Sequence, residues 1–434
     1  MKKALLYLTF SAHLFLLTYN CAVAQNNRNY RAYTSTEYNR DLLAADETFA
    51  SALSAFERNA RESYYDASAE VVTIPIVFHV LYTSPLDIID EGQILSQFEG
   101  LNRDFSLTEL PREDERDPGG SFRKLAADTK IRFCRPAFDP SGDATDGIEF
   151  RLIPFNIVDD LVALKDDLLG LAPWDGKRYL NIWVSPLPEG VGGFAQLPGG
   201  PLGLDGIVID PAYLGGGGMA REPYDQGKTL THLVGTYLGL KELWAGEGCE
   251  DDGVADTPIH NAPNVGRPGP GHTSTCDGYP AEMSMNFMDN TNDEATYMFT
   301  KGQVIRMRAA LAEGGPRAQL ASTETQCSVT EDLDFSPQTD PVLKVELSKE
   351  DIELRLTPNP SPGIFQANIT LAEEAGDGII TVIDISGRIM EERSLDGYQG
   401  FQTITIDGGN WPAGLYFIKL AQSEKAIVRR LTIQ

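Results

Sequence analysis

The sequence predicts an α+β domain followed by a small immunoglobulin-like β-sandwich. Two β-branched runs, at residues 71–80 and 180–184, are typical of buried strands, and a helix-forming stretch lies at residues 227–238. Short strands separated by Gly, Asp and Pro turns fill residues 351–434. These two patterns belong to different architectures, so we expect two folded units.

The N-terminus has the pattern of a secretory signal peptide over residues 1–24. Two lysines follow Met1, residues 4–19 are mostly apolar, and a small-x-small site lies at residues 22–24. We expect cleavage after Ala24. The apolar run is too short for a convincing membrane anchor and no second run of about 20 apolar residues occurs, so we expect no transmembrane segment in the mature protein.

Composition limits the classes of partner. The formal net charge is −27 over 434 residues, which repels phosphate backbones, so we expect no nucleic-acid binding. Removal of a signal peptide takes Cys21 with it and leaves four cysteines. An even number in an exported chain makes disulfides plausible.

The segments between these landmarks differ in character. Residues 25–70 are polar and charged and are interpreted as a propeptide-like arm. A folded domain is predicted over residues 71–315, with a helix at about 91–102 and a further strand at 131–134. Residues 316–350, rich in Ser, Thr, Glu, Asp and Pro, fit a linker.

The stretch around residues 227–242 has the spacing of a metal site. Positions 232 and 236 face the same way on a helix, and Gly239 can turn the chain back toward position 242. A working metzincin site has the form H-E-x-x-H-x-x-G-x-x-H, with three histidine ligands and a glutamate general base.

The surrounding sequence resembles the pappalysin family of metzincin peptidases. The matching segments run in order at residues 73–80, 96–97, 101–105, 180–184, 249–258, 286–289 and 298–303. This resemblance implies a metzincin-like metallopeptidase domain, with a mixed twisted sheet and an active-site helix. It also implies the zinc endopeptidase class of enzyme.

The sequence departs from the family pattern at the positions of the zinc ligands and the general base. His232 keeps the first ligand position, but Leu233 stands at the general-base position, Thr236 at the second ligand position and Glu242 at the third. His232 and Glu242 alone would make a shallow zinc site, so zinc is doubtful. Asn290 also replaces a tyrosine that family members often carry. No catalytic group is intact, and we predict catalytic impairment.

The resemblance implies several supporting features. Met288 stands at the Met-turn, and Cys249 and Cys276 close a disulfide around the loop after the helix. Asp252, Asp256 and Thr257 resemble a calcium-binding loop, with a solvated acidic loop as the alternative.

The sequence leaves two further features open. Cys134 and Cys327 are the two cysteines that remain beside Cys249 and Cys276, and nothing else in the sequence indicates that they are bonded to each other. The arm has no cysteine to cap a catalytic zinc, although an aspartate could serve.

The C-terminal segment is similar to the type A sorting domain of the type IX secretion system. The similarity rests on residues 356–363, 382–388, 411–419 and 426–431. It implies the type IX machinery as a partner and a secreted or cell-surface protein. An ordinary immunoglobulin-like accessory module is the alternative.

Three hypotheses for function follow. The leading one is a pseudopeptidase that binds a peptide or protein ligand through the former active site. The second is an active metalloendopeptidase with an atypical zinc site, in which His260 or His272 is the third ligand beside His232 and Glu242. For both of these histidines, however, we expect a position in a surface loop. The third is a structural cell-surface protein.

Overall fold

The structure is a computed structural model. It describes residues 31–84, 88–154, 160–246, 248–322, 327, 353–357, 361, 363–371, 378–384, 388–395, 400–412, 414–422 and 425–433. The predicted signal peptide and most of the predicted linker lie outside these residues. The chain divides into two compact units, Met1–Thr83 with Ile88–Phe335 and Ser84–Asp87 with Ser336–Gln434.

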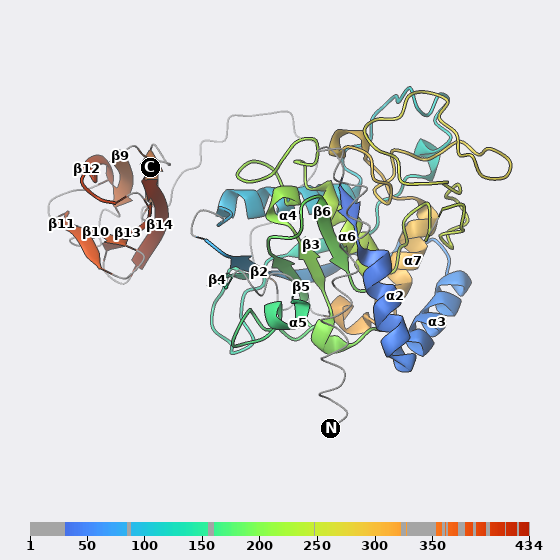
Figure 1. Cartoon of the computed structure of the whole chain (residues 1–434), viewed down its shortest axis with the longest axis horizontal. Coiled ribbons are helices and arrows are strands. Elements are labelled where there is room, and N and C mark those ends of the chain that lie inside the picture. The colour runs from blue at the N-terminus through green and yellow to red at the C-terminus, as the bar shows by residue number, and fades with distance from the viewer. Residues whose placement is uncertain are drawn as a thin grey trace. The chain divides into compact units, whose positions relative to one another are not determined.

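A seven-stranded mixed sheet forms the centre of the first unit (Figure 1). Its main path runs β1-β6-β7-β5-β2-β3, and β4 also pairs with β2. Strand β6 is antiparallel to β7, whereas the other pairs are parallel. The strands are β1 (Ala32–Tyr33), β2 (Val72–Tyr82), β3 (Ile131–Cys134), β4 (Ile148–Leu152), β5 (Leu180–Val184), β6 (Val191–Ala195) and β7 (Ile207–Ile209).

The α-helices in the described part of this unit are α2 (Ser35–Ala45), α3 (Glu47–Glu62), α4 (Glu91–Ser106), α5 (Leu161–Leu164), α6 (Lys228–Tyr237) and α7 (Lys301–Leu311). The helix predicted at residues 91–102 therefore continues for another turn. Phe105 lies on that extra turn and is fully buried, and Leu107 then ends the helix in the left-handed conformation.

The main core lies between the sheet and helices α4 and α6. Strands β2 and β5 contribute Ile76 and Ile182, and the helices contribute Leu101 and Leu233, all at most 1% exposed. Burial of these β-branched and aliphatic side chains explains why the strand segments were predictable from composition.

Residues 31–62 fold onto the domain as β1, α2 and α3. Asp46 caps α3 by accepting hydrogen bonds from the backbone N–H groups of Thr48 and Phe49. Phe56 of α3 is buried with Ala309 and Ala310 of α7, and the two helices lie side by side in Figure 1. The polar arm therefore contributes to the packed unit.

The second unit contains two antiparallel sheets, as expected for a β-sandwich. One has the order β11-β10-β13-β14 and the other β12-β9-β8. Apolar side chains from both sheets, including Ile369, Ile380 and Ile418, share one core. The strands are β8 (Glu353–Thr357), β9 (Ile364–Leu371), β10 (Gly378–Asp384), β11 (Ile389–Ser394), β12 (Gly400–Asp407), β13 (Gly414–Gln422) and β14 (Lys425–Ile433).

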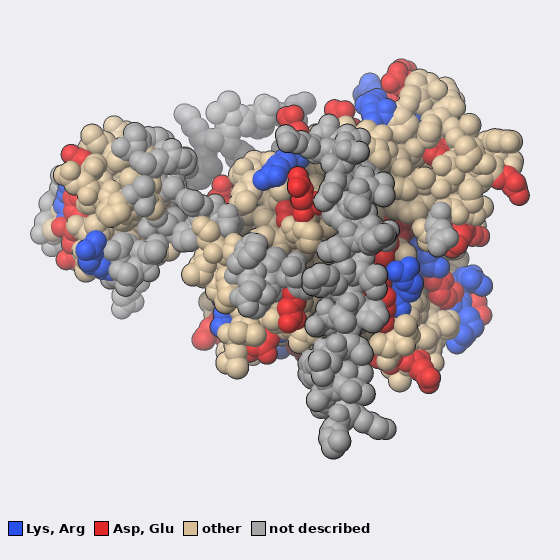
Figure 2. Space-filling view, in the orientation of Figure 1, with Lys and Arg blue, Asp and Glu red and all other residues tan. Residues whose placement is uncertain are grey.

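Two properties of the described residues bear on partners. No helix among them is long and apolar enough to cross a membrane. On the face drawn in Figure 2, acidic side chains stand among the basic ones, and the described residues form no broad basic patch there.

Candidate functional site: a substituted metallopeptidase site

Helix α6 carries the residues singled out by the sequence. It begins after Gly227 and is followed by a turn at Gly239, both in the left-handed conformation that favours glycine (φ +78° and +100°). Every residue of the helix is buried. We call His232, Leu233, Thr236 and Glu242 the substituted site.

Met288 lies directly against α6. A Cβ atom added to Gly235 would come within 2.7 Å of the Met288 sulfur, so the glycine allows the close approach of this side chain. Met288 is fully buried, and its backbone carbonyl accepts a hydrogen bond from Leu243 N–H. Met288, at the Met-turn position, therefore packs directly against α6.

His232 is oriented by the residue before Met288. Its Nδ1 lies 2.9 Å from the Phe287 carbonyl oxygen and donates to it, so Nε2 carries the lone pair. Nε2 is buried and has no hydrogen-bond partner among the described residues. Burial, with Arg31 nearby, lowers the pKa of His232 to about 3, so the imidazole is neutral at ordinary pH.

A tyrosine from the arm covers the imidazole. The Tyr33 ring stacks on His232 with centroids 3.6 Å apart and ring planes 6° from parallel. The Tyr33 hydroxyl is buried and, like His232 Nε2, lacks a hydrogen-bond partner within the described part of the chain. The side chain of His232 is 0% exposed as a result of this packing.

Leu233 and Glu242 are also held by neighbouring parts of the fold, whereas the Thr236 hydroxyl bonds within its own helix. Leu233 lies against β6, since a Cβ on Gly193 would meet its Cδ1 at 2.7 Å. Thr236 places its hydroxyl 3.5 Å from the His232 carbonyl oxygen within α6. Glu242 is 5% exposed, its Oε2 accepts a 2.9 Å hydrogen bond from Thr36, and burial raises its pKa.

Comparison with known proteins identifies the lineage. The family model described as pregnancy-associated plasma protein-A matches residues 163–312. An extracellular metalloprotease of Arthroderma benhamiae is 30% identical over 271 residues, covering 60% of this chain and 79% of the relative. The chain belongs to the pappalysin family of metallopeptidases.

Solved structures agree with this assignment. Mature mirolysin of Tannerella forsythia, in complex with a cleaved peptide, matches with 34% identity and a TM-score of 0.54, covering 60% of this chain and 99% of that one. A point mutant of promirolysin from the same organism matches with 30% identity and a TM-score of 0.59, covering 68% and 99%. The metzincin-like fold expected from the resemblance is confirmed.

The C-terminal unit has its own match. The family model described as a secretion system C-terminal sorting domain covers residues 355–434. The predicted type IX sorting domain is therefore confirmed, and the chain is a secreted or cell-surface member of its family.

The substituted site does not fit the zinc ion that pappalysins use. His232 has the tautomer of a metal ligand, but Thr236 offers only a hydroxyl, and Glu242 is a buried carboxyl hydrogen-bonded to the arm. Among the described residues, no group of three or more His, Cys, Asp or Glu side chains is arranged to hold a metal. No catalytic step through a metal is derived for these residues.

The expectation of surface positions for His260 and His272 is wrong for His260. His260 is fully buried, whereas the side chain of His272 is 43% exposed. His260 Nε2 accepts from Met283 N–H, and its Nδ1 faces carboxylate oxygens of Asp289 and Glu282 at 3.6 and 4.0 Å. Both ring nitrogens are thus directed to these groups rather than to His232.

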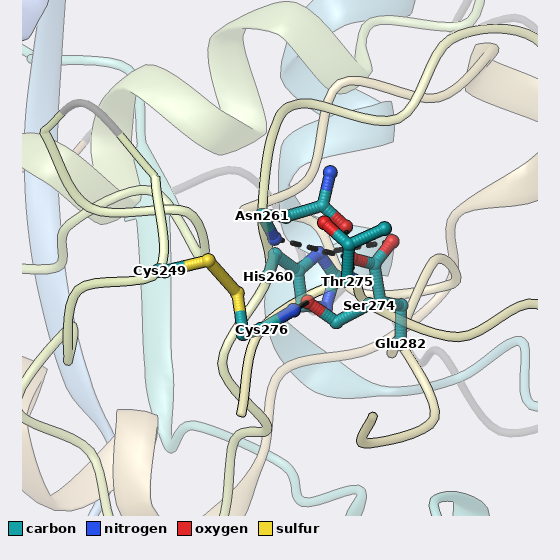
Figure 3. The surroundings of a disulfide bond; sticks show 7 residues. All are labelled: Cys249, His260, Asn261, Ser274, Thr275, Cys276 and Glu282. Atoms are coloured by element: carbon teal, nitrogen blue, oxygen red, sulfur yellow. Dashed lines mark hydrogen bonds and ion pairs between the residues drawn. A yellow bond between two sulfur atoms is a disulfide. The ribbon is translucent and has the colours of Figure 1, made fainter. Parts of the chain in front are cut away.

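A disulfide closes the loop beside His260 (Figure 3). Cys249 is joined to Cys276, with Cα atoms 5.5 Å apart, and Cys249 N–H donates to the His260 carbonyl oxygen. The Glu282 carboxylate accepts from Asn261 N–H at 3.2 Å, so Glu282 and the disulfide both hold this loop. A second disulfide joins Cys134 to Cys327.

The three residues predicted to bind calcium make hydrogen bonds with different partners. Asp252 accepts hydrogen bonds from the Thr257 hydroxyl at 2.9 and 3.0 Å, and burial raises the pKa of Asp252 to about 6. Asp256 instead accepts from Thr300 and Gly302 at the start of α7. The structure brings Asp252 and Thr257 together but turns Asp256 to the helix, and calcium binding stays a prediction.

Sequence reasoning missed the arm residues that complete the site. Arg31, Tyr33 and Thr36 contact Asp293, His232 and Glu242 respectively. That an aspartate of the arm could cap a catalytic zinc stays a prediction, and the ring that covers His232 is that of Tyr33. No motif signals these contacts, which join residues about 200 or more positions apart along the chain.

Proposed function

We propose that this chain is a secreted, catalytically impaired pappalysin with a binding rather than a hydrolytic role. The observation that carries the proposal is the stacking of Tyr33 on His232, the one histidine that remains in the motif. The general-base position is an apolar side chain packed on β6, so no group is placed to activate water. Three of the four positions that would do chemistry are held in packing or arm contacts.

Export is part of the proposal. The sorting domain match supports passage through the type IX machinery, and residues 1–24 are proposed to be the signal peptide for the first membrane. Removal of the sorting domain, or its exchange for a surface anchor, would determine whether the protein is released or retained at the cell surface.

The rival hypotheses differ in measurable ways. An atypical active peptidase needs a third ligand near His232, and both ring nitrogens of His260 face other groups. A structural surface protein would bind no peptide. Saturable binding of a partner to the purified protein would distinguish the binding role from the structural one.

The test is metal content combined with proteolysis. Residues 25–434 are purified, dialysed against trace zinc, and analysed for bound metal; a mixed protein substrate is then digested with and without chelator. We expect far less than one zinc per chain and no chelator-sensitive cleavage. Near-stoichiometric zinc together with cleavage that chelator abolishes would overturn the proposal.

A further inference from the structure

The N-terminal arm is held in the substituted site through its backbone. Strand β1 pairs in parallel with β6, and Thr34 N–H donates to the Gly193 carbonyl oxygen at 3.2 Å. The adjacent Gly192 leaves room for the arm, because a Cβ there would lie 2.9 Å from Cγ of Arg31. The β6 edge is therefore already used by residues 32–33.

Arg31 anchors the start of this segment. It is 1% exposed and pairs with the fully buried Asp293 at 2.9 Å, while also donating to the Thr229 hydroxyl at 2.7 Å. Its guanidinium lies over the ring of Tyr224, 4.2 Å from the centroid. A buried, multiply bonded guanidinium is costly to extract, because its carboxylate partner would be left uncompensated.

Two departures from the family pattern now hold the arm. Asn290, which replaces a tyrosine, accepts from Arg31 Nε at 3.2 Å and donates its Nδ2 to the Arg31 carbonyl oxygen at 2.7 Å. Glu242, at the third ligand position, accepts from Thr36. The side chains that replaced catalytic groups are thus bonded to both ends of residues 31–36.

The helices that follow fasten the segment further. Asn39 of α2 donates to the Ala195 carbonyl oxygen and accepts from Leu197 N–H, both at 2.8 Å. Glu57 of α3 forms an ion pair with Arg306 of α7. Release of residues 31–36 would therefore disturb contacts along the arm as far as α3.

We propose that residues 31–36 are a permanent intramolecular ligand of the substituted site, retained in the exported protein rather than removed as a pro-segment. The larger share of this chain covered by promirolysin than by mature mirolysin supports a pro-segment-like ancestry for the arm. The inference rests on the proposed function and narrows it: partners bind outside the β6 edge and the His232 position.

Chemical labelling of histidines tests this directly. Residues 25–434 contain four histidines: His232, the half-exposed His272, and the fully buried His79 and His260. The purified protein is treated with diethylpyrocarbonate near neutral pH, and each site is quantified by mass spectrometry. We expect His232, like the buried controls His79 and His260, to react at least ~10-fold more slowly than His272.

A variant and a mass measurement complete the test. Tyr33→Gly removes the covering ring and should raise His232 labelling ~10-fold while His79 and His260 stay protected, whereas Tyr64→Ala, at an 82% exposed site, should change nothing. If the Tyr33→Gly protein unfolds, His79 and His260 also react. The test then rests on the rate at which wild-type His232 is labelled relative to His272. The intact mass of the exported protein must include residues 31–36.

Either of two results overturns the inference: wild-type His232 that reacts as fast as His272, or an exported protein that begins after residue 36. Both can occur in a protein that neither binds zinc nor cleaves substrate. The inference can therefore fail while the proposed function stands, and zinc-dependent cleavage would end both.

Discussion

The substituted site and the segment of residues 249–300, apart from Asn290, differ in how far they depart from the pappalysin pattern. The segment keeps its disulfide, the Asp252–Thr257 contact and Met288 under the helix. Among the four positions of the substituted site, three in α6 and one at Glu242 beyond it, only His232 keeps the residue type of the zinc motif. The two regions therefore differ in kind: the contacts that stabilise the fold match the family pattern, whereas the residue types that hydrolysis needs do not.

Arg31→Ala should have the largest effect, because it removes the arm's buried partner from Asp293. Loss of one member of a buried ion pair costs about 3–5 kcal/mol of unfolding free energy. Chemical denaturation measures it, with the exposed Arg40 of α2 changed to Ala as the matched control, for which the expected change is within about 0.5 kcal/mol. Equal effects of the two variants would show that the arm is not fastened at Arg31.

The disulfide variant Cys249→Ser with Cys276→Ser tests the retained loop. The bond closes a loop with a sequence separation of 27 residues. Its loss should lower the unfolding free energy by about 3.5 kcal/mol in the chain-entropy account. Denaturation of the variant beside wild type under non-reducing conditions gives the value. An unchanged midpoint would mean that the loop is braced by its hydrogen bonds alone.

Leu233→Glu restores the catalytic residue type to the substituted helix. Leu233 is 0% exposed and packs on Gly193, so a carboxyl group there should cost about 3 kcal/mol and confer no proteolysis. Leu233→Met, of similar volume, should cost less than about 1.5 kcal/mol. A Leu233→Glu protein as stable as wild type would indicate that polar space for catalysis survives beside α6.

The pH dependence of stability should report the burial of His232. Its pKa is about 3 in the folded protein, against an ordinary value of 6.5, so the unfolded chain takes up the proton first as pH falls. Stability from this group is complete above about pH 6.5 and is lost toward about pH 3. Between about pH 7.5 and about pH 5, wild type should lose about 2 kcal/mol more than His232→Gln.

Denaturation curves at the two pH values measure that difference. His272→Gln serves as the matched control, because its side chain is partly in solvent. A wild-type slope identical to that of His232→Gln would contradict the buried, neutral imidazole.

The elements that sequence could predict are those fixed by local pattern. The strand at residues 180–184 carries adjacent β-branched and aromatic residues, and α6 has a helical stretch between two glycines. Tyr33 could not be placed on His232, because a two-residue strand has no periodicity and its partner lies 199 positions away. His260 was misplaced because a loop can be buried when a disulfide and carboxylates enclose it.

Zinc titration calorimetry on residues 25–434 measures whether the substitutions and the packed arm leave a zinc site in this protein. We expect no saturable zinc binding by wild type with a Kd below about 1 µM, and no difference between wild type and His232→Gln. One zinc bound per chain with a lower Kd, and lost in His232→Gln, would contradict this expectation.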